Sequence, residues 1–413
     1  MSSDAASNGR LKQVLALGVT QTIAWASSTY LPAILAQPIA ADLGLSASTV
    51  FGAFSVSLIV MAVAGPPVGR AIDRRGGRGV LALANLVLAA GLVFLGLATN
   101  AAAVFAAWCV LGVGMAMGLY DAAFATLVRL HGATARAPIT GVTLIAGFAS
   151  TVGWPLTAFV AEQFGWREAC FGWAALNILV ALPLNLLCIP SASREAHEHD
   201  RPASAGGAAD EKPKPGWSHP GQRRAFVLLA LFSAATAFVT SAMAAHLPGL
   251  LLAAGATTVA ALTAAALLGP AQVAARLAEF LAAHRFSFHP LVTARIATAL
   301  HPVGALVLGV FGGAPLAASG FAVLHGAGNG MITIAKGTLP LAIFGVAGYG
   351  LLQGLLGVLA RAMQALAPYA FGLVLEGFGV RVAIGLSAGL SLAALAALFG
   401  LRARAPEPPR RTE

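Results

Sequence analysis

The chain has 413 residues, of which 58% are hydrophobic and only 10% are charged, and its formal net charge is +10. Its mean hydropathy of +0.82 exceeds that of soluble domains, in which apolar residues make up about half of the chain or less. Apolar runs recur along most of the sequence, and each is about 20 residues long, enough to cross about 30 Å of hydrocarbon as a helix. Because backbone groups in lipid must be satisfied within each segment, the composition excludes a soluble protein and predicts an all-α polytopic membrane protein.

We expect about twelve membrane-spanning helices. In chain order, their predicted ranges are residues 12–39, 49–69, 79–98, 101–128, 138–161, 168–189, 225–252, 258–281, 289–311, 314–336, 349–373 and 381–402. The first ten residues, MSSDAASNGR, lack the basic region and short apolar core of a removable signal peptide. The first helix is therefore expected to remain in the protein.

Basic residues gather in segments that face the cytoplasm if the N-terminus lies there. These segments are residues 70–78, 129–136, 194–224 and 402–411. Of the basic residues in the loops, only Arg167 and Arg381 fall on the other side. This asymmetry follows the positive-inside rule, so we expect a multi-pass protein of the cell (inner) membrane with both termini in the cytoplasm. Topology thus explains the basic excess, and no nucleic-acid partner is expected.

The two halves of the sequence repeat each other with an offset of 213–214 residues. Gly112 corresponds to Gly326, and the segment FGWR at 164–167 corresponds to FGVR at 378–381. Several matches in order at nearly one offset indicate an internal repeat. The repeat predicts two pseudo-symmetric six-helix bundles of the same orientation.

This repeat also suggests a domain organisation. We expect an N-terminal bundle over residues 1–190, a flexible cytoplasmic linker over 191–224, a C-terminal bundle over 225–402 and a cytoplasmic tail over 403–413. The linker is rich in Pro, Ala, Gly and charged residues, which is typical of a flexible connection.

The segment GRAIDRRGGR follows the second predicted helix and resembles the loop signature Gly-x-x-x-Asp-(Arg/Lys)-x-Gly-x-(Arg/Lys) of the major facilitator superfamily. The residues that match the signature are Gly69, Asp73, Arg74, Gly76 and Arg78. With the helix number, the repeat and the linker, the resemblance covers essentially the full chain. It implies a secondary transporter that works by alternating access and holds its substrate between the two bundles near the bilayer centre.

The charged loop is predicted to act as a gating latch, a contact that holds one conformation and breaks in the other. Asp73 ends a helix, where its carboxylate can reach basic side chains or the free N–H groups at the start of a neighbouring helix. Asp121, toward the cytoplasmic end of the fourth helix, is expected to complete the latch by pairing with Arg74 or Arg78. The alternatives are a proton relay through Asp121 and a solvated loop that serves topology alone.

Polar side chains inside the predicted spans are candidates for substrate contact, because they are costly in the membrane and usually face a cavity. The candidates are Arg361, Arg276, Gln272, His325, Asn329, Gln364, Tyr30 and Gln21. For Arg361, the alternative is a tether to a carboxylate on another helix. For Arg276, it is an ion pair with Glu279. For His325, it is simple packing.

Arg276 and Arg361 lie on the eighth and eleventh predicted helices, with few acids near them, and two such cations predict an anionic substrate. This arrangement resembles the oxalate/formate and monocarboxylate branches of the superfamily, which implies basic residues that engage a carboxylate. We expect a monomeric transporter of a small carboxylate-like anion, by exchange or proton coupling, with no cofactor. The alternatives are an efflux pump for a neutral or toxic compound, organic metalloids included, and a non-transporting scaffold or receptor. No metal-ligand cluster or nucleophile set in the sequence favours an enzyme.

Overall fold

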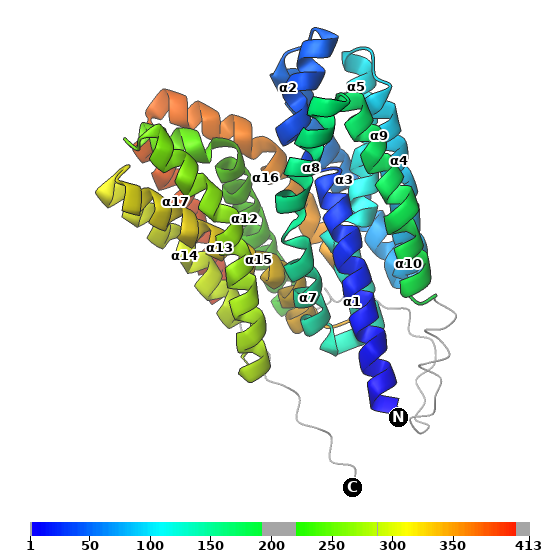
Figure 1. The fold of residues 1–413 in the computed structure, drawn as a ribbon. Helices are drawn as coiled ribbons and strands as arrows, with labels where there is room; N and C mark the ends of the chain where they lie inside the picture. Colours follow the sequence, from blue (N-terminus) through cyan, green and yellow to red (C-terminus); the bar gives the residue numbers. More distant parts are fainter. Residues whose placement is uncertain (1, 192–219, 287, 402–413) are drawn as a thin grey trace.

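A computed structural model describes residues 2–191, 220–286 and 288–401, and all regular secondary structure in these ranges is helical (Figure 1). The helices of the first half are α1 (Ser2–Ala26), α2 (Leu31–Leu43), α3 (Ala47–Arg75), α4 (Gly77–Gly96), α5 (Ala101–Gly118), α6 (Tyr120–His131), α7 (Arg136–Ala146), α8 (Ala149–Gln163), α9 (Trp166–Leu176) and α10 (Leu182–Cys188). Those of the second half are α12 (Pro220–Ala253), α13 (Thr258–Arg285), α14 (Pro290–Phe311), α15 (Pro315–Phe344), α16 (Tyr349–Phe378) and α17 (Val380–Phe399).

Ten helical runs in the described residues are long and apolar enough to cross a membrane. The two other predicted spans correspond to α1 with α2, which are separated at residues 27–30, and to α15, which carries Lys336. The prediction of an all-α fold with about twelve spans is therefore confirmed.

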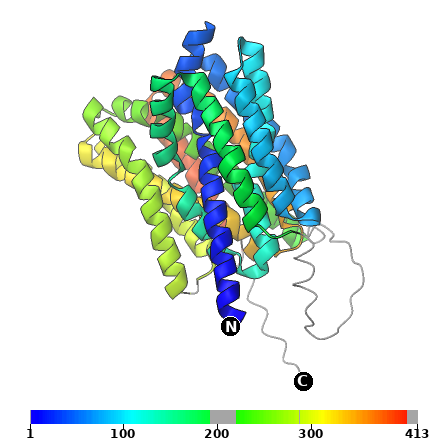
Figure 2. The same ribbon diagram turned by 45° about the vertical axis from the view of Figure 1, so that its right-hand side comes forward.

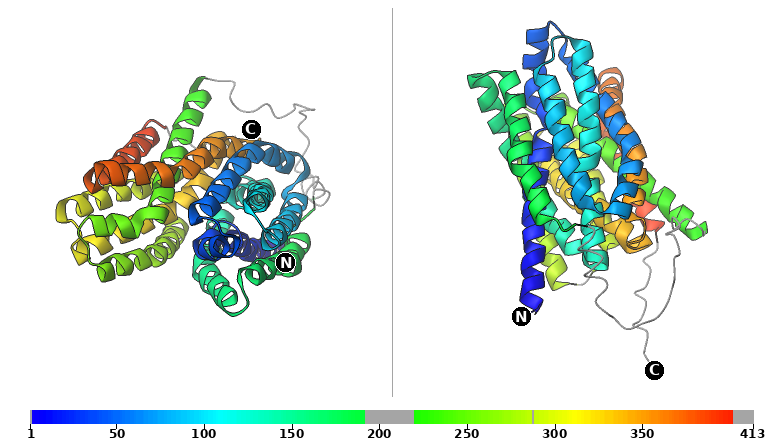
Figure 3. Two further views of the ribbon diagram at one scale, coloured as in Figure 1. Left: turned by 90° about the horizontal axis from the view of Figure 1, so that it is seen from above. Right: turned by 90° about the vertical axis from the view of Figure 1, so that its right-hand side faces the viewer.

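The helices form two bundles that lie side by side, α1–α10 in one and α12–α17 in the other, as the view from above shows (Figure 3). Each bundle has its own apolar core, in which Trp108 and Phe371 are among the large side chains that are fully buried. Lipid is as apolar as these side chains, so the helices within a bundle cohere mainly through close packing and hydrogen bonds.

The first and fourth predicted spans are each divided into two helices. In the first span, the Ser28 hydroxyl donates to the Ala24 carbonyl, and Pro32 enters the first turn of α2, where its missing N–H costs nothing. In the fourth, Leu119 is extended between α5 and α6. An interrupted helix is tolerated in a membrane where protein groups satisfy the freed backbone.

Gln21 supplies such a group at the second break. Its side-chain amide donates to the carbonyl of Gly118, the last residue of α5, and its side chain is only 1% exposed. The sequence predicts Gln21 as a substrate residue. In the structure it instead joins the first span to the broken fourth span inside the first bundle.

The repeated glycines occupy equivalent packing positions in the two bundles. A Cβ at Gly112 in α5 would lie 2.5 Å from the carbonyl oxygen of Ser57 in α3. A Cβ at Gly326 in α15 would lie 2.6 Å from the carbonyl oxygen of Leu268 in α13. Each bundle thus brings the same pair of helices together through the same glycine, in accord with a pseudo-symmetric fold.

The main contacts between the bundles are made by α3, α6 and α7 of the first and by α13, α15 and α16 of the second. We call the end of the molecule at which α1 begins the terminal side (Figure 2). Residues 192–219 of the predicted linker and the predicted tail lie outside the described residues, and α12 already begins at Pro220.

Candidate functional site at the interface of the two bundles

The carboxylate of Asp73 joins the end of α3 to the start of α16. Its two oxygens accept hydrogen bonds from the N–H groups of Gly350, at 2.8 Å, and Leu351, at 2.9 Å. The first N–H groups of a helix have no partner inside that helix, and the helix dipole favours a negative charge there. Asp73 therefore caps a helix of the opposite bundle. The sequence allowed two kinds of partner for this carboxylate, basic side chains or the free N–H groups of a helix start. The structure shows the second kind.

The other loop residues lie around this contact. Arg74 is exposed and Arg78 is half-buried, and neither pairs with Asp121 in the part of the chain that the structure describes. Gly76 has a φ of +80° and allows the sharp turn from α3 into α4. Arg129 of α6, which the sequence analysis did not single out, donates to the backbone carbonyl of Asp73 and holds the end of α3 in place.

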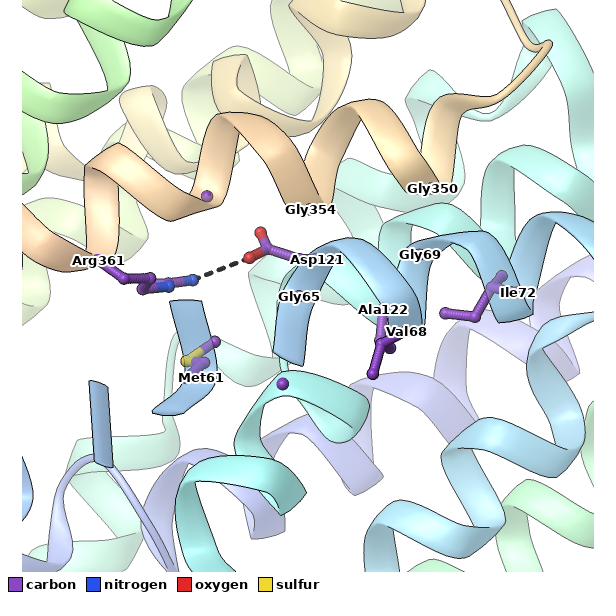
Figure 4. Close-up of a pocket in the computed structure, with 12 residues that line it drawn as sticks. Met61, Gly65, Val68, Gly69, Ile72, Asp121, Ala122, Gly350, Gly354 and Arg361 are labelled. Carbon is purple, nitrogen blue, oxygen red and sulfur yellow. Dashed lines mark hydrogen bonds and ion pairs between the residues drawn. The ribbon is translucent and has the colours of Figure 1, made fainter. Parts of the chain in front are cut away.

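Near Asp73, α3 and α16 touch through their backbones. Gly65 and Gly69 of α3 face Gly354 and Gly350 of α16 (Figure 4). A Cβ at Gly65 would lie 3.4 Å from the Gly354 carbonyl oxygen, and a Cβ at Gly69 would overlap the Gly350 carbonyl oxygen. Because the nearest atoms at Gly69 belong to the other bundle, this residue controls how closely the bundles meet.

Replacing Gly69 with alanine is expected to lower transport about tenfold or more, because a methyl group there pushes the bundles apart at a cost of about 1–3 kcal/mol. The thermal unfolding of the protein should change little, since the atoms nearest to the added methyl group all belong to the opposite bundle. Uptake by proteoliposomes measures the first effect, and circular dichroism measures the second. Gly79→Ala is the matched control, because a Cβ there would have no atom within 4 Å. Wild-type uptake by Gly69→Ala would contradict the prediction.

Asp121 forms its ion pair with Arg361 of the opposite bundle. The Arg361 Nη2 lies 3.1 Å from the Asp121 Oδ2, and the two side chains are 16% and 32% exposed (Figure 4). The prediction that Asp121 pairs with Arg74 or Arg78 is wrong, because Asp121 lies ten residues, about 15 Å, before the end of α6 at His131. The tether proposed as the alternative role of Arg361 is the arrangement found.

This ion pair borders a small pocket between α3, α5, α6 and α16. Met61, Ala116, Asp121 and Arg361 are among the residues that line it. Arg361 also donates to the side-chain oxygen of Gln364, at 2.8 Å, so this predicted substrate residue helps to orient the guanidinium. The pair therefore lies at the edge of a small pocket and stays partly exposed.

A second ion pair joins the bundles nearer the terminal side. Arg136, at the start of α7, places its Nη2 2.9 Å from the Glu279 Oε1 and donates to the Phe288 carbonyl at 2.6 Å. Glu279 is 4% exposed, so its charge depends on this partner. The alternative of an Arg276–Glu279 pair is wrong, because Glu279 reaches across to α7 while Arg276 donates to neutral groups.

His289 lies beside this second pair, in the connection that precedes α14. Its Nδ1 accepts the N–H of Leu291 and so caps the start of the helix. Burial, together with the nearby charges of Arg136 and Arg295, holds the pKa of His289 below its usual value. The ring is therefore neutral near pH 7, as its role as an acceptor requires.

Arg276 is 5% exposed and has uncharged partners. It donates to the carbonyl oxygens of Thr143, at 2.9 Å, and Gly330, at 3.3 Å, and to the Thr333 hydroxyl at 3.4 Å. Within the described ranges, no carboxylate lies within 4.0 Å of it. A buried charge without a counter-ion is costly, so this guanidinium is a strong candidate for binding an anion.

An aromatic cluster lies next to Arg276 on the side of the first bundle. The Tyr30 ring centroid lies 5.9 Å from that of Trp25 and 5.8 Å from that of Trp154, and Tyr120 lies 4.9 Å from Trp25. The Arg276 guanidinium is within electrostatic range of the hydroxyl groups of Tyr30 and Tyr120. The structure thus brings Tyr30 and Arg276, two predicted substrate residues, to one place.

Two further candidates lie in the second bundle. Asn329 accepts a hydrogen bond from the Thr240 hydroxyl at 2.9 Å, which ties α15 to α12. The backbone of Gln272 packs against Gly330, where a Cβ would find no room. Neither contact involves the first bundle.

His325 lies away from the interface, stacked on His301 with ring centroids 4.4 Å apart. Both rings are buried, and neither nitrogen of His301 has a hydrogen-bond partner among the described residues. In the repeat, His325 corresponds to Leu111, 214 residues earlier, and His301 corresponds to Leu88, 213 residues earlier. Both leucines are buried in the core of the first bundle, so the two histidines stand where the first bundle has a leucine pair. His325 therefore has the packing role that was given as its alternative. Among the described residues, no group of three or more His, Cys, Asp or Glu could hold a metal ion.

Lys336 of α15 is a further charged residue at this interface, and the sequence alone did not point to it. Asp121 and Arg361 both lie within electrostatic range of its ammonium group. Lys336 is the last residue of the predicted helix at 314–336, because a lysine is typical of the end of a membrane span. In the structure α15 continues to Phe344. The signal that could have located it is its spacing from Asn329 and Thr333, which puts the three side chains on one face of the helix.

Two helical bundles that meet across a charged, glycine-lined interface define a two-bundle membrane transporter. The chain belongs to the Major Facilitator Superfamily, whose sequence model matches residues 17–335. It is therefore a multi-pass membrane transporter of a small-molecule solute and not an enzyme. The resemblance to this superfamily is confirmed, while the assignment to the oxalate/formate or monocarboxylate branches stays a prediction.

Two curated relatives match parts of the chain. An uncharacterized 38 kDa protein in the 23S RNA operon of Thermoproteus tenax is 33% identical over 154 residues, which are 37% of this chain and 40% of that protein. An MFS-type efflux pump of Mycolicibacterium smegmatis is 32% identical over 219 residues, which are 52% of this chain and 47% of the pump. The chain thus matches less than half the length of either relative.

Solved transporters share the fold over nearly the whole chain. FucP in the outward conformation has a TM-score of 0.72 at 13% identity, covering 95% of this chain and 99% of FucP. The proton:xylose symporter XylE has a TM-score of 0.69 at 14% identity, covering 95% and 96%. The human organic anion transporter MFSD10 has a TM-score of 0.67 at 17% identity, covering 94% and 99%. At these identities the likeness shows the fold.

Proposed function

We propose that the protein is a secondary active transporter of a small anion and that Arg276 is the principal anion-binding residue. The observation that carries the proposal is the burial of Arg276 among neutral acceptors alone within the described residues. A substrate carboxylate would supply the missing counter-charge through charge-assisted hydrogen bonds. Its bond to Thr143 of the other bundle makes Arg276 sensitive to the relative position of the bundles. The shared fold with an organic anion transporter agrees with this proposal.

We further propose that the terminal side faces the cytoplasm of a cell with an inner membrane. The positive-inside pattern of the sequence supports this orientation. Asp73, the glycine contact and the Arg136–Glu279 pair then close the cytoplasmic side, which leaves the substrate site reachable from outside. The similarity to FucP in its outward conformation agrees with that state. The gating latch, in this proposal, is Asp73 with the start of α16.

The Asp121–Arg361 pair offers a means of coupling. A substrate anion, or a proton on Asp121, would compete with the pair and weaken the contact between α6 and α16. Exchange of anions and proton-coupled movement both follow from this competition. In this proposal Arg361 has two roles: it holds the gate closed through Asp121, and it releases Asp121 when a substrate anion competes for its charge.

Replacing Arg276 with glutamine tests the function. We expect anion uptake to fall about 100-fold, since a buried charge-assisted contact contributes about 2–3 kcal/mol. Uptake is measured in proteoliposomes with labelled acetate, lactate, phosphate and sulfate. Arg295→Gln is the matched control, because Arg295 also donates to carbonyl groups, those of Leu398 and Leu401, but inside the second bundle. Equal uptake by Arg276→Gln and wild type would refute the anion proposal.

The similarity to an efflux pump supports a second candidate, the export of a neutral or toxic compound. In that case cells that express the protein would resist such compounds, and Arg276→Gln would keep the resistance. Growth assays across drugs, organic acids and organic metalloids distinguish the two functions.

A further inference from the structure

Among the described residues, the interface carries more cations than carboxylates to pair with them, and the most deeply buried of these cations is Arg276. Asp121 is paired with Arg361, and Glu279 is paired with Arg136. In the described part of the chain, this leaves Arg276 and Lys336 of the second bundle without a carboxylate within ion-pair distance. No hydrogen bond joins the Lys336 ammonium to another described residue.

The two unpaired cations meet neighbouring turns of α15. Arg276 reaches the Thr333 hydroxyl, and Lys336 follows Thr333 by three residues, about 4.5 Å along α15. Arg276 lies nine residues before the end of α13 at Arg285, and Lys336 lies eight residues before the end of α15 at Phe344. Since α13 and α15 pack against each other, the two cations have nearly the same depth.

The position of Lys336 is fixed by the helix that carries it. The side-chain amide of Gln353 donates to the Lys336 carbonyl at 3.0 Å, which ties α15 to α16 at this residue. Gly337 packs its backbone against Phe124 of the first bundle. Lys336 therefore lies at the boundary between the two bundles, next to the ion pair of Asp121.

That ion pair does not neutralise Lys336. Asp121 attracts the ammonium group and Arg361 repels it, and both lie within electrostatic range. Because the pair has no net charge, its two effects on Lys336 largely cancel. The region of Arg276 and Lys336 thus carries two positive charges that have no carboxylate partner among the described residues.

We infer that Arg276 and Lys336 form a two-point site that selects anions with two carboxylates separated by a short chain. The inference rests on the proposed anion transport and adds the substrate class to it. One carboxylate engages the guanidinium through two parallel N–H donors, and the second engages the ammonium. A monocarboxylate leaves one cation without a partner and binds more weakly.

The test compares acetate with malonate, succinate and glutarate on the purified full-length protein. Affinity is measured from the shift in thermal unfolding with ligand concentration and from counterflow in proteoliposomes. For the wild type, we expect at least one dicarboxylate to bind about tenfold more tightly than acetate. Lys336→Gln should remove that preference and change the affinity for acetate less than about threefold. Lys336→Arg, which keeps the charge, should keep a dicarboxylate preference.

Lys12→Gln is the matched control, because Lys12 is exposed near the start of α1, and it should behave as the wild type. The inference is overturned if the wild type binds acetate as tightly as every dicarboxylate, a comparison that needs no variant. It is also overturned if Lys336→Gln weakens acetate and dicarboxylates equally. If the wild type binds no anion at all, the proposed function itself fails, and this outcome is distinct from the other two.

Discussion

Replacing Asp73 with alanine is expected to shift the protein out of the state closed on the terminal side. The change removes two hydrogen bonds to the start of α16 and a charge that the helix dipole favours. A loss of about 2 kcal/mol changes the ratio of the two conformations about 30-fold. Transport should fall with it, because the cycle needs both conformations.

Spin labels on the side opposite the terminal side measure this shift. Phe164 and Phe311, each 67% exposed, provide one labelling position on each bundle after substitution by cysteine. In electron–electron double resonance, Asp73→Ala should move the distance distribution to shorter values. Asp42→Asn is the control, because Asp42 pairs with Arg167 inside the first bundle. An unchanged distribution in Asp73→Ala would exclude the latch.

The second large effect is expected at the Asp121–Arg361 pair. Arg361→Gln alone should lower the thermal stability, because Asp121 keeps a charge without its partner, and should lower transport about 100-fold. Partial exposure of both side chains limits the stability loss to about 1–2 kcal/mol. Asp121→Asn with Arg361→Gln should regain the stability and not the transport.

This double-mutant cycle separates the two roles of Arg361. If the double variant regains transport as well, Arg361 acts as a tether alone, and its contact with substrate is refuted. The single variant Asp121→Asn tests the coupling. It should retain exchange of anions across the membrane and lose uptake driven by a pH gradient. Equal loss of both activities would contradict a coupling role for Asp121.

The fold could be predicted from the sequence because each membrane span depends on the residues within it. Apolar runs predict spans, and the repeat that includes Gly112 and Gly326 predicts two similar bundles. The contact of Asp73 with a helix start was among the expected alternatives, since any acid at a helix end can serve a neighbouring dipole. These inferences need no knowledge of which helices meet.

The partners across the interface could not be predicted in the same way. Whether Asp121 faces the charged loop or Arg361 depends on the direction in which α6 points after the break at Leu119. Glu279 likewise finds Arg136 because α7 crosses α13, a contact between distant parts of the chain. Lys336 was missed because α15 runs eight residues beyond its predicted end.

The glycine contact between α3 and α16 has a consequence for relatives with other cargo. A gate whose nearest atoms are peptide groups requires glycine and one acidic side chain, and it makes few demands on the surrounding residues. Those residues are free to diverge as a lineage acquires a new substrate. A binding site can then be rebuilt in evolution while the moving parts of the transporter stay the same.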